Sequence, residues 1–81
     1  MRFLWTSTNR AKLAAHGVTT RDIEEAMTAA DMRIGPGADH VRLYLSGTVG
    51  ARMLQVIASP TAPDELYVVT AYFTNQRRRR P

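Results

Sequence analysis

The side chains in this sequence that could do chemistry are mostly cations and aromatic rings. Arginine can bind a phosphate through two parallel hydrogen bonds, and tyrosine or histidine can exchange protons or stack on an unpaired base. These groups suit RNA cleavage without a metal, in which a base, an acid and a cation assist attack of the 2′-hydroxyl on phosphorus. The residues concerned are Lys12, His16, His40, Arg42, Tyr44, Arg52 and Tyr72.

Other chemistries lack the residues that they need. The sequence has no cysteine, and its two histidines have no clustered carboxylates, so we expect neither a metal site nor a cofactor. Gly35-Pro36-Gly37 has neither the spacing nor the following lysine of a phosphate-binding loop. Ser46 and Ser59 stand in predicted turns without a neighbouring base, which argues against a serine nucleophile.

Positive charge is concentrated in the last residues. Arg77 to Arg80 supply four of the eleven basic residues, which leaves seven Lys and Arg against seven Asp and Glu. This run is either a solvated, flexible end or an arm that holds phosphates, because neighbouring arginines displace counterions from nucleic acid. No apolar run approaches the roughly 18 residues of a membrane span, and no signal-peptide segment follows Met1. We therefore expect a cytoplasmic protein with no membrane partner.

A short helix over about residues 9–16 must position the first of the cations. A strand over Arg2–Trp5 precedes it, and the polar residues 6–9 supply turn and cap side chains. Gly17 can take the left-handed conformation that ends a helix, and Val18 can fold back on the last turn. This helix end is the clearest local signal in the sequence.

A second helix should begin almost at once. Thr19 can act as the N-cap with Asp22 three residues on, and Val18 and Ile23 have the spacing of a hydrophobic staple. The helix should fade near Asp31. Its core-facing stripe is expected to contain Ile23, Ala26, Met27 and Ala30.

Beyond a break at Gly35-Pro36-Gly37 the periodicity changes to two, which is typical of strands. We expect strands over about residues 41–46, 51–58 and 65–73, with a hairpin turn between the first two and a proline-containing turn before the last. The element order β-α-α-β-β-β predicts an α+β fold with two helices packed on one face of a small, mostly antiparallel sheet. We expect one domain over residues 1–76 and a flexible basic tail over 77–81.

Several motifs together resemble the BrnT family of bacterial type II toxins. The opening run contains Trp5, Asn9-Arg10, Leu13 and His16-Gly17-Val18, and Thr19 and Glu24-Glu25-Ala26 follow. Segments 42–47, 50–54 and 66–71 resemble the strands of that family, so the resemblance covers nearly the whole chain. It implies a RelE-like fold, cleavage of free or ribosome-bound RNA that inhibits translation, and a cognate antitoxin that binds DNA.

The resemblance also suggests roles for individual residues. Arg52 would stabilise the charge on the phosphate in the transition state, and Tyr72 or His40 would exchange protons. The residues expected to bind RNA are Arg10, Lys12, His16, Arg42, Tyr44, Arg77 and Arg78. Each residue also has a structural interpretation: His16 as a capping or packing side chain, and Arg52 as a strand-end residue that reaches solvent.

Two departures from the family pattern keep an alternative open. BrnT proteins usually carry an acidic residue just before the second strand, where this chain reads Asp39-His40, and an arginine where this chain has Tyr72. The alternative is a catalytically inert module of the same fold that binds a protein partner or nucleic acid. A DNA-binding domain is a weaker interpretation, because no helix carries a basic reading face.

Overall fold

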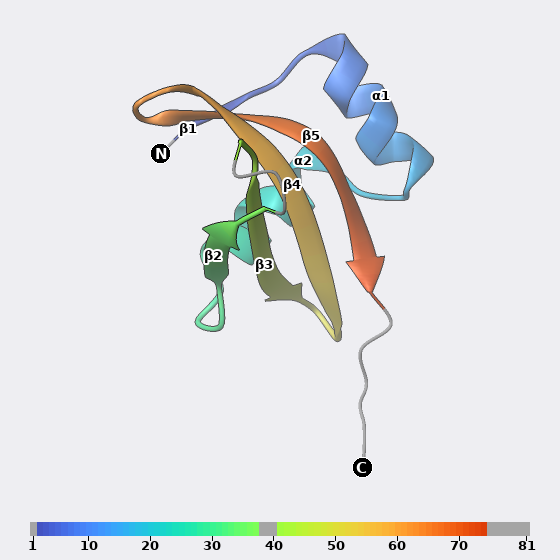
Figure 1. Cartoon of the computed structure of the whole chain (residues 1–81). Helices are drawn as coiled ribbons and strands as arrows, with labels where there is room; N and C mark the ends of the chain where they lie inside the picture. Colours follow the sequence, from blue (N-terminus) through green and yellow to red (C-terminus); the bar gives the residue numbers. More distant parts are fainter. Residues whose placement is uncertain (1, 38–40, 75–81) are drawn as a thin grey trace.

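Both helices lie on one face of a sheet whose strands run in the order β1-β5-β4-β3-β2 (Figure 1). The computed structural model describes residues 2–37 and 41–74. Within these ranges, β1 pairs with β5 in parallel and the other neighbouring strands are antiparallel. The elements are β1 (Arg2–Leu4), α1 (Ser7–Ala15), α2 (Thr20–Met27), β2 (Arg33–Pro36), β3 (Leu43–Val49), β4 (Arg52–Ala62) and β5 (Glu65–Thr74). The predicted α+β fold is confirmed, with one strand more than expected.

A single hydrophobic core fills the space between the helices and the sheet. α1 contributes Leu13, and α2 contributes Ile23 and Ala26. The strands contribute every second residue, because successive side chains of a strand point to opposite faces. The buried strand residues are Leu45, Leu54, Val56, Ala58, Leu66, Val68 and Ala71.

The junction between the two helices forms as the sequence predicts. The N–H of Val18 donates to the Leu13 carbonyl (2.9 Å) and that of Gly17 to the Ala14 carbonyl (3.0 Å), which is a Schellman motif. Gly17 has φ +71°, the left-handed conformation that glycine adopts without strain. Thr19 and Asp22 then form the predicted capping box at the start of α2.

α1 begins at Ser7, two residues earlier than expected, because Thr6, the first of the polar residues expected to supply cap side chains, is its N-cap. Asn9 is buried, with only 1% of its surface exposed. Its side-chain oxygen accepts from the Thr6 N–H (2.7 Å), and its amide nitrogen donates to the Leu4 carbonyl (2.8 Å). Asn9 therefore ties the end of β1 to the first turn of α1.

α2 is shorter than expected and stops at Met27. The hydroxyl of Thr28 donates to the carbonyls of Glu24 (3.2 Å) and Glu25 (3.1 Å), so it satisfies acceptors of the last turn. Ala30 consequently falls outside the helix and is exposed, so its place in the predicted core stripe was wrong.

β2 is the strand that the sequence pattern did not predict. It pairs with β3 through Arg33↔Ser46, Ile34↔Leu45, Gly35↔Tyr44 and Pro36↔Leu43. Glycine and proline usually interrupt strands, but β2 lies at the edge of the sheet, where proline need not donate to a second neighbour. β4 likewise runs through Pro60 to Ala62, because β3 begins opposite Ala58 and leaves that end of β4 without a neighbour on one side.

The C-terminal tail expected over residues 77–81 lies outside the described residues, so the domain boundary after residue 76 stays a prediction. No helix in the described part of the chain is long and apolar enough to cross a membrane.

Candidate nucleic-acid interface

One face of the sheet packs against the helices, and no helix of the described residues covers the other face (Figure 1). The register of β3, β4 and β5 assigns side chains to this uncovered face in cross-strand rows. One row contains Tyr44, Ile57 and Thr70, and the next contains Ser46, Gln55 and Tyr72. We call the surface formed by these residues and by Thr48, Met53 and Thr74 the uncovered face.

Two tyrosines stand out on the uncovered face. Tyr44 is 46% exposed and Tyr72 is 41% exposed, although both belong to regular strands. They flank β4, so their Cα atoms are separated by about 10 Å across the sheet and about 7 Å along the strands. Exposed aromatic rings on a sheet can stack on the bases of an unpaired strand of RNA.

The electrostatics of the uncovered face are compatible with a polyanion. Residues 43–59 and 66–74 contain no Asp or Glu. Glu65, which precedes the second stretch, forms an ion pair with Arg2 (3.5 Å). Asp31, from outside these strands, accepts from the Thr48 N–H (3.0 Å) and from the Thr48 hydroxyl. The hydrogen bond from the Thr48 side chain is the main reason that the pKa of Asp31 lies below its usual value. Asp31 is thus engaged with the end of β3 rather than directed at the tyrosines.

Arg52 lies at the end of the sheet, on the other face from Tyr72. It is the first residue of β4, pairs with Val49, and shares the face of Leu54. Its guanidinium stacks on the ring of Phe73, 3.8 Å from the centroid, and the residue is exposed. Tyr72 pairs with Gln55, whose side chain is on the uncovered face. The structure therefore brings Arg52 and Tyr72 to the same end of the sheet but not to the same face.

The cations of α1 form a separate group. Arg10, Lys12 and His16 are all exposed, and within the described residues none of them forms an ion pair. They belong to α1, which packs against β5 in the helical layer, whereas the register places Tyr44 and Tyr72 on the uncovered face. His16 is the C-cap of α1.

The structure describes only one of the remaining predicted site residues. Arg42 is exposed and directly precedes β3, and its carbonyl accepts from the Gly37 N–H (2.8 Å). His40, Arg77 and Arg78 lie outside the described residues. The roles of all these residues remain predictions.

The sequence pattern does not indicate one cation, in β2, that the fold places beside the uncovered face. Arg33 in β2 pairs with Ser46, so it continues the row that contains Gln55 and Tyr72. The alternation of Met32, Arg33 and Ile34 is typical of a strand, but the Gly35-Pro36-Gly37 that follows predicts a break. Arg33 is exposed and adds a cation at the β2 side of the uncovered face.

The fold has a counterpart among solved structures. It is similar to the crystal structure of the Brucella abortus ribonuclease toxin BrnT, with a TM-score of 0.70 and 24% sequence identity. The match covers 94% of this chain and 99% of that chain. No protein-family model matches the chain, and none of the curated proteins matches it either. The expected resemblance is therefore confirmed at the level of the fold: this chain folds as that ribonuclease toxin does.

Proposed function

We propose that this chain is the toxin of a type II toxin–antitoxin pair, a cytoplasmic ribonuclease that cleaves RNA and so inhibits translation. The observation that carries the proposal is the uncovered face, where Tyr44 and Tyr72 are exposed in two stretches, residues 43–59 and 66–74, that contain no acidic residue. The shared fold with a ribonuclease toxin supports the same function. A cognate antitoxin that binds DNA is the proposed protein partner.

In this proposal the RNA lies single-stranded across the uncovered face. Bases stack on Tyr44 and Tyr72, whose separation exceeds the distance between neighbouring stacked bases, so the two rings contact different nucleotides. Arg33 and Arg42, at the β2 and β3 side, contact phosphates, and hydroxyls such as Ser46 and Thr70 can bond to base edges or to the ribose. The arginines at 77 and 78 are proposed to add phosphate contacts.

Arg52 is proposed to hold the phosphate that is cleaved, at the end of the sheet. The 2′-oxygen of the preceding ribose forms a bond to phosphorus, and the bond from phosphorus to the 5′-oxygen breaks. A base accepts the 2′-hydroxyl proton and an acid donates a proton to the leaving 5′-oxygen, which yields a 2′,3′-cyclic phosphate and a free 5′-hydroxyl. The guanidinium of Arg52 stabilises the negative charge on the pentavalent phosphorus.

Tyr72 or His40 is proposed to exchange the protons. The position of Tyr72 on the face opposite Arg52 also suits a second role, in which its ring binds the base next to the cleaved phosphate. The two roles make different demands, because only proton exchange requires the hydroxyl.

The test is cleavage of a fluorescently labelled single-stranded RNA by the purified protein in the presence of a chelator. The native chain should produce fragments that end in a cyclic phosphate. The Arg52→Ala variant should be at least about 100-fold slower, the size of effect that loss of a charge-stabilising donor has on catalysis. Arg21→Ala, which removes an exposed arginine from α2, is the matched control and should cleave normally. Undiminished cleavage by Arg52→Ala would refute the assignment.

One observation favours a second candidate, a catalytically inert module of this fold that binds a partner. Arg52 and Tyr72, the two proposed catalytic side chains that are described, do not share a face. Induced expression in a bacterial host distinguishes the two functions. A toxin arrests growth and is neutralised when the product of the neighbouring open reading frame is expressed with it, whereas a binding module causes no arrest.

A further inference from the structure

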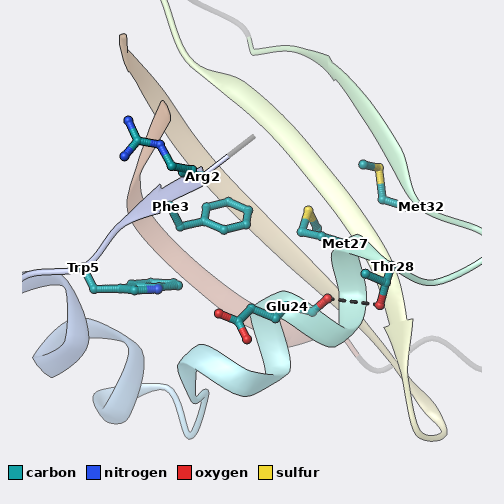
Figure 2. Close-up of a pocket in the computed structure, with 7 residues that line it drawn as sticks. All are labelled: Arg2, Phe3, Trp5, Glu24, Met27, Thr28 and Met32. Atoms are coloured by element: carbon teal, nitrogen blue, oxygen red, sulfur yellow. Dashed lines mark hydrogen bonds between the residues drawn. The ribbon is translucent and has the colours of Figure 1, made fainter. Parts of the chain in front are cut away.

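A second surface lies on the helical side of the sheet, away from the uncovered face. It is an open pocket of about 630 Å³ between β1, α2 and the segment that leads to β2. Its walls are formed by the rings of Phe3 and Trp5 and by the thioethers of Met27 and Met32 (Figure 2). The two rings lie 5.7 Å apart between centroids and are tilted by 30°. Methionine side chains adapt their shape, so walls of this kind accept apolar side chains of several sizes.

The lining of this pocket contains one charge of each sign. Arg2 and Glu24 are the charged residues among those that line it. The guanidinium of Arg2 points away from the other lining side chains and forms ion pairs with Asp64 (3.6 Å) and Glu65 (3.5 Å) (Figure 2). Glu24 is exposed and forms no ion pair within the described residues. The carboxylate of Glu24 is therefore the charge that an occupant of the pocket meets.

From this combination we propose that the pocket docks a segment of a protein partner that presents a large apolar side chain next to a lysine or arginine. The apolar side chain enters between Trp5 and the two methionines, and the cation pairs with Glu24. The carboxylate of Glu24 disfavours a phosphate beside it, and the titration below includes RNA and anionic vesicles as alternative occupants. The proposal rests on the proposed function in one respect, because it assigns this segment to the inhibitory partner of the toxin.

Docking at this pocket leaves the uncovered face free. The pocket lies on the helical side of β1 and the tyrosines lie on the opposite side of the sheet. A partner anchored here can therefore be bound while RNA is still in contact with Tyr44 and Tyr72. An inhibitor that uses this pocket must then act by reaching around the edge of the sheet, or by holding the toxin without covering its RNA-binding face.

The sequence supplies a reporter for the pocket, since Trp5 is its one tryptophan. The full chain is titrated with a short peptide of leucine and lysine, and its tryptophan emission is recorded. We expect a saturable shift in emission with this peptide, and none with a matched leucine–glutamate peptide, a serine–lysine peptide, a single-stranded RNA or anionic vesicles. A shift of equal size with the leucine–glutamate peptide, the RNA or the vesicles would overturn the proposal. So would an emission change on concentrating the protein alone, which would identify a second copy as the occupant.

Matched variants test whether the leucine–lysine peptide binds in this pocket. Glu24→Gln should raise the Kd for the leucine–lysine peptide about two- to fivefold, as expected for loss of an exposed ion pair. Glu25→Gln removes the same charge one residue further along α2, outside the pocket, and should leave the Kd within about twofold. Met32→Ala, which lies outside the hydrophobic core, should raise it about tenfold. Unchanged affinity in both Glu24→Gln and Met32→Ala would overturn the proposal.

The same samples separate this proposal from the proposed function. RNA cleavage is measured with and without a saturating amount of the peptide. Loss of the emission shift with intact cleavage refutes the docking pocket alone, whereas a normal emission shift without cleavage refutes the ribonuclease alone.

Discussion

The guanidinium carbon of Arg52 lies 3.8 Å from the centroid of the Phe73 ring, where the first residue of β4 meets the end of β5. A planar guanidinium stacked on an aromatic ring is held in one orientation while its N–H groups remain open to solvent. An exposed arginine would otherwise sample many rotamers. The ring therefore orients the cation for the phosphate contact that we propose for Arg52 at this end of the sheet.

Replacing the ring tests this relationship. Phe73→Leu removes a contact worth about 0.5–1 kcal/mol at an exposed site, so RNA cleavage should fall about two- to fivefold. Arg52→Lys should lose more, because lysine cannot form two parallel hydrogen bonds to a phosphate. Cleavage rates and thermal melting are measured together, so that a loss of folded protein is not mistaken for a loss of rate. Normal cleavage by Phe73→Leu would show that the stacking is not used.

The two proposed roles of Tyr72 predict different behaviour in two variants. Tyr72→Phe keeps the ring, so RNA binding measured by fluorescence anisotropy should be unchanged, and cleavage should fall only if the hydroxyl exchanges a proton. Tyr72→Ala removes the ring and should weaken binding about tenfold, within the range measured for single stacked bases. Tyr44→Ala should weaken binding to a similar degree. If neither alanine variant binds more weakly, RNA does not use the uncovered face.

Gly47 is the point at which α2 approaches the sheet most closely. A Cβ built on Gly47 would collide with the backbone carbonyl oxygen of Ala26, and neither backbone can move without shifting the helix. Gly47→Ala should therefore lower the free energy of unfolding by about 3 kcal/mol, as overpacking does. Gly35→Ala is the matched control, because a Cβ there meets open space, and it should be neutral or slightly stabilising. Urea unfolding of both variants measures the difference.

Asn9 is expected to contribute to stability rather than to RNA binding. Asn9→Ala leaves the Thr6 N–H and the Leu4 carbonyl without their partners in a partly buried site, which should cost about 1–2 kcal/mol. Thr19→Ala removes an exposed capping side chain from α2 and should cost about 1 kcal/mol. Both variants should bind RNA normally at temperatures where they are folded. A fall in RNA affinity without a fall in stability would contradict this role for Asn9.

Asp31 should make stability depend on pH in a defined direction. Its pKa lies below the usual value of 3.8, mainly because the Thr48 hydroxyl bonds to the charged carboxylate. A carboxyl group with a lowered pKa stabilises the fold above its unfolded pKa, and this contribution disappears as the pH falls through the folded pKa.

The Asp31→Asn variant isolates that contribution from those of the other carboxylates. Its melting temperature should be below that of the native chain at neutral pH, and the difference should shrink as the pH drops below 3.8. Glu25→Gln, on an exposed carboxylate of α2, should show no such convergence. A difference in melting temperature that persists at acid pH would mean that the charge of Asp31 is not what stabilises its contact with Thr48.

The parts of this protein that depend on neighbouring residues can be predicted from sequence alone. The Schellman motif at Gly17, the capping box of Thr19 and Asp22, and the burial of Val18 and Ile23 all follow from side chains within five positions of one another. The α+β class followed from the change of hydrophobic period after the second helix. The likeness to a ribonuclease toxin was also visible in sequence motifs before the fold confirmed it.

Only the tertiary structure decided which of the candidate side chains share a face. β2 forms because β3 offers it a partner, and Pro60 remains in a strand because β3 begins only opposite Ala58. Neither condition follows from the residues next to β2 or Pro60 in the sequence. The bulge in the pairing of β4 with β5, near Ile57 and Ala58, shifts the alternation along β5 by one residue. A shift of one residue moves every later side chain to the other face of a sheet. Without the bulge, Tyr72 would share the face of Leu66 and Val68, which is also the face of Arg52. With the bulge, Tyr72 lies on the opposite face.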